Sequence, residues 1–157
     1  MTNKEIKIGY REYESVSALP AADKELADAA IQAIDNAYAP YSRFNVGAAV
    51  MFEDGEIIKG SNQENAAYPS GLCAERTALV YASASRPEKK MAAIAIAAAQ
   101  NGEICKNPVT PCGACRQVMV QYQTKSGRPM KVILAGADKV WVFEKVDDLL
   151  PFIFDSI

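Results

Sequence analysis

Two short cysteine motifs constrain this chain more than any other feature. Residues 73–75 read Cys-Ala-Glu and residues 111–115 read Pro-Cys-Gly-Ala-Cys, and the chain contains no histidine. Three thiolates can hold a zinc ion and leave its fourth position free for a water molecule. A fold that uses these ligands must bring both motifs to one point. Proton transfer near neutral pH must then come from a group other than imidazole.

The length of 157 residues and the composition indicate a single domain with one hydrophobic core. Hydrophobic residues make up 50% of the chain, the net charge is −2 and the pI is about 5.2. No Lys/Arg cluster provides the basic face that phosphate contacts require, so we expect no nucleic-acid partner.

The sequence shows neither a membrane-spanning segment nor a signal peptide, and this predicts where the protein is located. The most apolar run, residues 91–99, is far shorter than the roughly 20 residues that cross a bilayer, so no membrane partner is expected. The charged first ten residues do not resemble a signal peptide. We therefore expect a cytoplasmic protein, where thiols stay reduced and four cysteines indicate metal binding or catalysis rather than disulfides.

Sequence patterns predict alternating helices and strands. An apolar stripe with helical spacing spans residues 20–38, and Asp54-Gly55 is a turn signal between two short strands. Loops at 60–71 and 100–111 each lead into a helix. The expected helices are 20–38, 73–83 and 112–122, and the expected strands are 46–52, 56–59, 91–99, 130–134 and 139–143. This order predicts the α/β class, as a three-layer α/β/α sandwich around one mixed sheet.

The cysteine spacing predicts how the metal would be held. Cys112 and Cys115 are three positions apart, which places both sulfurs on one side of the first turn of a helix. Cys73 also stands at an expected helix start. The positive ends of the two helices lower the pKa of nearby thiols and favour thiolates. Glu75, two residues from a ligand, is then placed to act on water at the open metal position.

Other interpretations of these motifs remain open at this point. A closed structural zinc site needs a fourth ligand, which would be Cys105. All four cysteines also fit the role of small core residues, and Glu75 fits a carboxylate that merely favours a helix N-terminus. The position of Glu75 argues against a structural site, because such a site needs no acid beside it.

Three thiolates around Zn²⁺ leave an excess negative charge, which weakens the metal as a Lewis acid. Arg76 and Arg116 each directly follow a motif residue. We expect both to lie behind the ligands and donate hydrogen bonds to sulfur. The alternative for each arginine is a solvent-facing position on its helix.

Four ordered blocks around the motifs resemble the small cytidine deaminases. They are residues 41–49 (YSRFNVGAA), 62–68 (NQENAAY), 73–79 (CAERTAL) and 111–117 (PCGACRQ). The two cysteine motifs are the sulfur variant of the zinc deaminase signature. The resemblance covers roughly residues 20–155, so residues 1–18 are expected to be an N-terminal extension and 19–157 a single catalytic domain.

The resemblance implies hydrolytic deamination of cytidine and 2'-deoxycytidine to uridine and 2'-deoxyuridine in pyrimidine salvage, with release of ammonia. It implies one Zn²⁺ per subunit, held by Cys73, Cys112 and Cys115. Glu75 matches the residue that moves protons from the attacking water to the pyrimidine and to the leaving amine. Such general acid–base work contributes about 10²- to 10⁴-fold in rate.

The resemblance also assigns the substrate contacts. Asn62 and Glu64 match residues that bind a ribose hydroxyl, whereas without the resemblance both would be interpreted as loop caps. Phe44 matches an aromatic that packs on the pyrimidine, and its alternative is ordinary core. The amide of Ala74 would point at the pyrimidine carbonyl. The family's small members imply a homotetramer with shared active sites, in which Phe154 matches an aromatic that reaches a neighbouring site.

Two further functions remain as alternatives. One is a related deaminase with another substrate, such as a blasticidin S-type aminonucleoside or a nucleobase. The block Asn62-x-Glu64-Asn65-Ala66 favours an ordinary ribonucleoside instead. The other is a non-catalytic, zinc-stabilised binding module, which predicts that Cys105 is a ligand and that Glu75 is dispensable.

Overall fold

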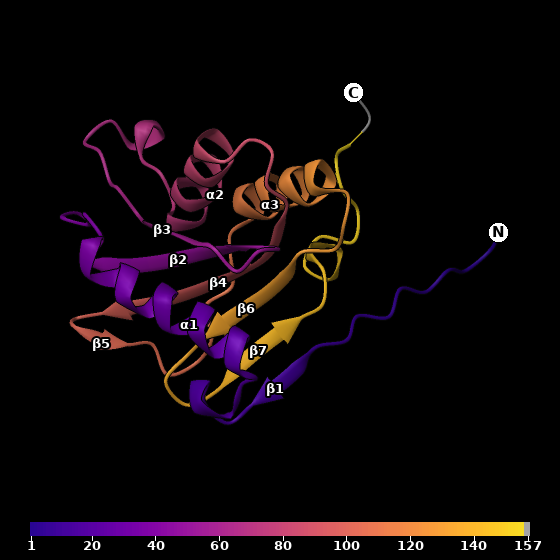
Figure 1. Cartoon of the computed structure of the whole chain (residues 1–157), viewed down its shortest axis with the longest axis horizontal. Helices are drawn as coiled ribbons and strands as arrows, with labels where there is room; N and C mark the ends of the chain where they lie inside the picture. The colour runs from indigo at the N-terminus through magenta and orange to yellow at the C-terminus, as the bar shows by residue number, and fades with distance from the viewer. Residues whose placement is uncertain (156–157) are drawn as a thin grey trace.

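The computed structural model describes residues 1–155 as one mixed sheet between two helical layers (Figure 1). The strands lie in the order β1-β7-β6-β4-β2-β3, and the short strand β5 pairs with β4. Only β4 and β6 are parallel, and the other strand pairs are antiparallel. The strands are β1 (Arg11–Tyr13), β2 (Phe44–Phe52), β3 (Ile57–Ser61), β4 (Met91–Gln100), β5 (Glu103–Ile104), β6 (Lys131–Ala135) and β7 (Val140–Phe143).

Three α-helices cover the two faces of the sheet. The helix α1 (Ala21–Ala33) packs on one face, whereas α2 (Ala74–Ser85) and α3 (Gly113–Ser126) lie together on the other (Figure 1). Short 3₁₀ turns at Val16–Ala18, Ile34–Asn36, Tyr68–Ser70 and Val146–Asp148 connect these elements. The α/β/α sandwich predicted from the sequence is confirmed.

The central strand β4 is buried on both faces, as its continuous apolar sequence predicts. Ile94 and Ile96 point into the core beneath α2 and α3. The intervening alanines at 93, 95 and 97 face α1. Small side chains on that face allow α1 to approach the sheet closely. A Cβ atom on Gly47 of β2 would lie 2.1 Å from the carbonyl oxygen of Ala30, so this position requires glycine.

The first helix is shorter than the apolar stripe predicted. The α-helix ends at Ala33, a 3₁₀ turn follows to Asn36, and Tyr38 is extended. The amide of Tyr38 donates to the carbonyl of Asn62 at 2.9 Å, and its own carbonyl accepts from the amide of Glu64 at 2.8 Å. These bonds to a distant loop override the helical pattern, and they place that loop beside the end of the helix.

The other boundaries differ by few residues from those predicted. The hairpin turn at Asp54-Gly55 is confirmed, and β3 continues to Ser61 into the expected loop. The expected loop at 100–111 contains the two residues of β5, which pair with the end of β4. The two helices expected after the loops are confirmed at Ala74–Ser85 and Gly113–Ser126.

The N-terminal segment adds a strand to the sheet. β1 pairs with β7, although it lies within the predicted extension of residues 1–18. Residues 1–10 have no regular secondary structure and are exposed. The boundary near residue 19 stays a prediction. Within residues 1–155, no helix is long and apolar enough to cross a membrane.

Candidate active site

Both cysteine motifs lie at the start of a helix. Cys73 is the N-cap of α2 and Cys112 is the N-cap of α3, and both have an extended backbone. Their carbonyls accept the amides of Thr77 and Arg116, each at 3.0 Å, as the first hydrogen bonds of the two helices. The helices lie side by side beneath the same face of the sheet, which brings their N-termini together (Figure 1).

The sulfurs of Cys73, Cys112 and Cys115 lie within 4.8 Å of one another. Cys115 is fully buried, and Cys112 is exposed. Across residues 1–155 no other group of three or more cysteine and acidic side chains comes together in this way, and Cys105 lies outside the cluster. The closed four-cysteine site is therefore not formed, and the three-thiol ligand set is the arrangement that the sequence predicts.

The electrostatics of the cluster fit a divalent cation. The pKa of Cys73 is lowered to about 5, because the thiol of Cys115 donates a hydrogen bond to its sulfur and Arg76 lies nearby. The pKa of Cys115 is raised, because its thiol makes that bond and the group is buried. The thiolate of Cys73 thus places negative charge where the three sulfurs meet. An all-sulfur donor set of three fits one zinc ion.

Glu75 lies in the first turn of α2 beside the thiol cluster, and it is 5% exposed. Burial raises the pKa of its carboxyl group, and the thiolate of Cys73 raises it further. A carboxyl group whose pKa is shifted toward neutral pH can both accept and donate a proton. Glu75 lines the same cleft as Cys73 and Cys112, so its carboxyl group is accessible from the space available to a substrate.

Arg76 has the position behind the ligands that the sequence predicts. Its Nη2 atom lies 3.9 Å from the sulfur of Cys73 and 3.2 Å from the carbonyl oxygen of Gly71. Its Nε atom is buried and has no hydrogen-bond partner within the part of the chain that the structure describes. The guanidinium thus brings positive charge to the sulfur cluster.

Arg116 has different partners from those expected. Its Nε atom donates to the carbonyl of Pro111, and its Nη1 atom donates to the carbonyl of Leu149, each at 2.8 Å. Its hydrogen bonds thus go to the main chain and not to sulfur. Because a side chain in the first turn of a helix points back toward the preceding loop, Arg116 holds the residues before Cys112 in place.

A cleft of about 710 Å³ opens beside the cluster. The predicted substrate contacts Phe44, Asn62, Glu64 and Ala74 all line it, together with Glu75 and the two motif cysteines 73 and 112. Phe154 does not line this cleft. Its main chain is bound to the side chain of Gln117 on α3, with distances of 2.8 and 3.3 Å.

Glu64 and Asn62 are held by main-chain groups. One carboxylate oxygen of Glu64 accepts the amides of Tyr41 at 2.8 Å and Ser42 at 3.2 Å. A hydrogen bond from the Ser42 side chain, followed by these amides, keeps the pKa of Glu64 below its usual value. Both amides contact the same oxygen, Oε2.

The side chain of Asn62 bridges the backbone of β2. Its Oδ1 atom accepts from the amide of Val46 at 2.8 Å, and its Nδ2 atom donates to the carbonyl of Phe44 at 2.9 Å. The loop-cap interpretation of Asn62 is therefore found in the structure. The same bonds position Phe44 at the cleft, so that any contact of Asn62 with a sugar adds to a structural role.

Sequence reasoning missed two tyrosines at the cleft. Tyr41 and Tyr68 both line it, and their rings meet edge to face with centroids 5.9 Å apart. Both side chains are largely exposed. Each stands at the end of one of the sequence blocks described above, which is the signal that could have identified them.

Comparisons with known proteins agree with this geometry. Residues 20–127 match the family model described as the cytidine and deoxycytidylate deaminase zinc-binding region. A cytidine deaminase from Halalkalibacterium halodurans is 52% identical over 92 residues, which are 59% of this chain and 65% of that protein. A probable cytidine deaminase from Dictyostelium discoideum is 35% identical over 129 residues, 82% of this chain and 81% of that protein.

A solved structure gives the same picture over more of the chain. The crystal structure of cytidine deaminase from Burkholderia pseudomallei is 42% identical with a TM-score of 0.69, and the alignment covers 83% of this chain and 97% of that one. The match to the Halalkalibacterium protein spans slightly less than two thirds of that protein's length.

Proposed function

Because the chain belongs to the cytidine and deoxycytidylate deaminase family, we propose that it deaminates cytidine and 2'-deoxycytidine to uridine and 2'-deoxyuridine. One observation carries the proposal: buried Glu75 lies beside a three-thiol cluster, at a cleft that is also lined by Phe44, Asn62 and Glu64. The cluster and acid supply hydrolytic chemistry, and the cleft offers aromatic and polar groups for a nucleoside.

The three cysteines would hold one zinc ion per subunit. When bound, the ion supplies Lewis-acid activation of water. The cleft side of the cluster is formed by Cys73 and Cys112, while Cys115 is buried behind them. Arg76, 3.9 Å from the sulfur of Cys73, offsets part of the negative charge of the thiolates.

Glu75 is proposed to carry the protons of the reaction. Its carboxylate accepts a proton from the water that attacks C4 of the pyrimidine and delivers it to ring N3. Glu75 then moves the proton of the new C4 hydroxyl to the amine, which leaves as ammonia when the C4–N bond breaks and the C4 carbonyl forms. One water is consumed and one ammonia is released, so the reaction balances without an oxidant or a reductant. Burial raises the pKa of the Glu75 carboxyl group, which suits it both to accept and to donate a proton.

The substrate contacts are proposals that follow from the cleft. Phe44 supplies an aromatic surface for the pyrimidine, and Glu64 offers its carboxylate at the cleft to a ribose hydroxyl. The amide of Ala74 is the first of α2 and has no partner within its own helix. It therefore remains available to the pyrimidine carbonyl. Asn62 supports Phe44 and adds a contact to the sugar.

We also propose a homotetramer with active sites completed across subunits, acting in pyrimidine salvage in the cytoplasm. Exposed apolar side chains on α2 and in the C-terminal segment support subunit contacts, namely Val80, Tyr81, Phe152 and Phe154. Phe154 is 65% exposed and so is free to reach a neighbouring site. Three thiols that must stay reduced suit the cytoplasm. The acidic net charge does not favour nucleic acid or anionic membrane as partners.

The proposal is tested with purified zinc-loaded protein and cytidine, by following the ultraviolet change that accompanies loss of the ring amine. Glu75→Gln should lower kcat by about 10²- to 10⁴-fold or more while zinc content stays the same. Glu88→Gln, which changes an exposed glutamate in the loop after α2, serves as the matched control. Chelation should abolish activity, and added zinc should restore it.

Several outcomes would contradict the proposal. Full activity of Glu75→Gln would remove the acid–base role, and loss of zinc in Cys105→Ser would restore the structural-site interpretation. Rapid turnover of blasticidin S or cytosine without turnover of cytidine would assign the cleft to another substrate.

A further inference from the structure

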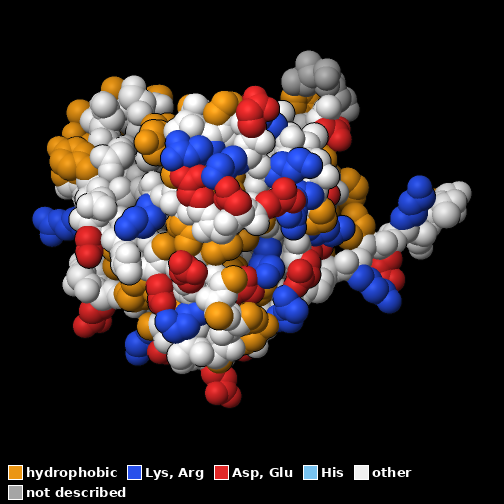
Figure 2. Space-filling model, in the orientation of Figure 1, with side chains coloured by type: hydrophobic (Ala, Val, Ile, Leu, Met, Phe, Trp, Pro, Cys, Tyr) orange, Lys and Arg blue, Asp and Glu red, His pale blue; other side chains and the backbone are white. Residues whose placement is uncertain are grey.

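The N-terminal arm, residues 1–10, has no place in the proposed reaction. It leaves the sheet beyond β1 as an extended segment that projects from the body of the molecule (Figure 1). Figure 2 shows both acidic and basic side chains on this projection. Within residues 1–155, β1 pairs with β7 alone, so its other edge offers free main-chain donors and acceptors. An edge of this kind is a template for another strand.

The base of the arm is fixed against the sheet. The ring of Tyr10 lies 5.3 Å from the rings of both Trp141 and Phe143 of β7, and Arg11 forms an ion pair with Glu144. Ile6 and Ile8 continue the alternation that Tyr10 begins, and each is about half exposed. In an extended strand these three side chains share one face. The arm thus presents an apolar row in which Ile6 and Ile8 remain about half exposed to solvent.

We propose that this arm pairs antiparallel with the same arm of a second copy of the chain, with Ile8 on the two-fold axis. Ile6 of one copy then lies opposite Tyr10 of the other. Glu5 faces Arg11, and Lys4 faces Glu12, so both charged pairs have opposite signs. Opposite charges directly across a strand pair stabilise it, and like charges destabilise it.

The neighbouring registers are less favourable. A shift of two residues in one direction places Lys7 opposite Lys7 of the second copy. A shift in the other direction places Lys7 opposite Arg11. Both arrangements set like charges against each other, whereas the register centred on Ile8 contains no such pair. The order of charges in residues 4–12 therefore matches an antiparallel copy of itself in one register.

The pairing would join two sheets into one. Because β1 is the edge strand, residues 3–5 of the second copy placed beside it extend the sheet across the two-fold axis. The edge occupied by β1 is at the opposite end of the sheet from β3, and the cleft is lined by β2 and by the loop that follows β3. The contact is thus independent of the active site and separate from the subunit contacts proposed through α2. If the proposed homotetramer forms, its several arms would strengthen the arm-to-arm contact through multivalency.

Cross-linking of single cysteines tests the register. Ile8→Cys and Lys4→Cys are each placed in the full zinc-loaded chain carrying Cys105→Ser, and oxidised glutathione is added. Residues opposite each other across the axis have Cβ atoms about 5 Å apart, close enough for a disulfide after small adjustment. The two copies of residue 4 are instead about 27 Å apart, from about 3.4 Å per residue over the arm.

We expect Ile8→Cys to give disulfide-linked pairs on non-reducing gels at least about tenfold faster than Lys4→Cys. Absence of cross-linking at position 8, or equal rates at both positions, would overturn the proposal. Equal rates would mean random collision of mobile arms. Protection of the arm from protease without cross-linking at position 8 would place it on another surface, which also overturns the pairing.

A charge exchange tests the pairing chemistry without altering composition. Lys4→Glu combined with Glu5→Lys keeps the net charge and sets like charges opposite Arg11 and Glu12. Cross-linking through Ile8→Cys should then fall about tenfold, while deaminase activity, measured as a check of folding, stays the same. An unchanged cross-linking rate in the exchanged variant would show that charge order does not determine the contact.

Discussion

A Cβ atom on Gly60 would lie 2.5 Å from the amide nitrogen of Ala78, so the helix α2 rests directly on the main chain of β3. The N-cap of that helix is Cys73 and its first turn carries Glu75. The depth at which α2 sits on the sheet therefore sets where a ligand and the proposed proton carrier lie relative to the cleft.

Replacement of Gly60 by alanine should therefore lower both stability and activity. The added methyl group meets backbone that cannot move without displacing α2, and overpacking of this kind costs about 1–3 kcal/mol. Denaturant unfolding measures the loss in unfolding free energy. Zinc content shows whether Cys73 is still placed to bind the metal. Gly113→Ala is the control, because a Cβ there meets nothing within 4 Å. Equal stability of both variants would show that α2 can shift freely.

Asn62 is predicted to act on the structure as well as on the substrate. Asn62→Asp keeps the acceptor for the Val46 amide but removes the donor to the Phe44 carbonyl. A carboxylate oxygen would then face that carbonyl, so we expect a loss of about 1–3 kcal/mol in unfolding free energy. KM for cytidine should rise because Phe44 loses its support. A rise in KM with unchanged stability would limit Asn62 to a substrate contact.

The ion pair between Asp23 and Lys131 ties α1 to β6. The Lys131 ammonium lies 2.8 and 3.0 Å from the two carboxylate oxygens, and the Asp23 side chain is 10% exposed. Lys131→Met leaves this carboxylate without its partner and should cost roughly 1–3 kcal/mol. Adding Asp23→Leu should recover much of the loss.

The exposed pair of Lys24 and Asp28 on the same helix provides the comparison for that experiment. Both side chains are more than a third exposed, so Lys24→Met should change the unfolding free energy by less than about 1 kcal/mol. Equal losses from Lys24→Met and Lys131→Met would contradict the role of burial.

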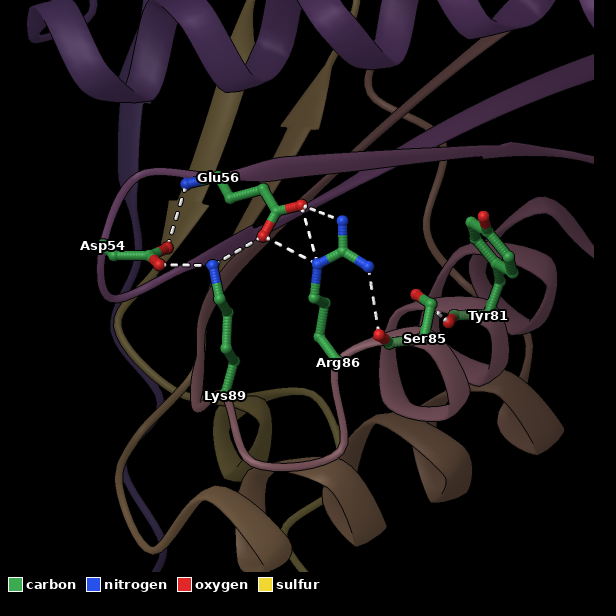
Figure 3. A network of polar contacts seen from close by, with 6 residues as sticks. All are labelled: Asp54, Glu56, Tyr81, Ser85, Arg86 and Lys89. Carbon is green, nitrogen blue, oxygen red and sulfur yellow. Dashed lines mark hydrogen bonds and ion pairs between the residues drawn. The ribbon is translucent and has the colours of Figure 1, made fainter.

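A network of charged groups joins the β2–β3 turn to the loop after α2 (Figure 3). Glu56 accepts hydrogen bonds from Arg86 at 2.9 and 3.1 Å and from Lys89 at 2.6 Å. The bond from Arg86, followed by that from Lys89, lowers the pKa of Glu56 below its usual value of 4.5. A lowered pKa means that the stabilising effect is present above the usual pKa and is lost as pH falls through the lowered one.

Glu56→Gln should therefore lower Tm modestly at neutral pH, and the difference from the unchanged protein should shrink in acid. Added salt should shrink it too, because these groups are partly exposed to solvent. Thermal unfolding measured from neutral pH down to the acid range provides the test, with Glu88→Gln as control. A difference in Tm that is independent of pH would mean that packing, and not the charge of Glu56, produces it.

Much of the fold was accessible from local pattern. The uninterrupted apolar run in β4 predicts a strand buried on both faces, and Asp54-Gly55 predicts the hairpin beside it. These patterns work because strand burial and turn geometry depend on residues close together in the chain. The end of α1 could not be predicted in this way, since Tyr38 is held by Asn62 and Glu64 from a distant loop.

The site shows the same division. The spacing of Cys112 and Cys115 determines that both sulfurs share one side of a helix start. The absence of histidine leaves an acid such as Glu75 to move protons. Those properties belong to the sequence by itself, together with the α/β alternation, because they follow from local geometry and from the chemistry of the available side chains.

Only the tertiary structure decided which partner each polar side chain would find. Arg76 lies beside a sulfur, while Arg116, in the equivalent place after its own motif, is bound to the carbonyls of Pro111 and Leu149. Asn62 is engaged by β2, and Phe154 lies along α3 outside the cleft of its own chain. A hydrogen bond needs two atoms within about 3 Å of each other. The spacing of residues along the sequence does not determine which distant atoms the fold brings that close.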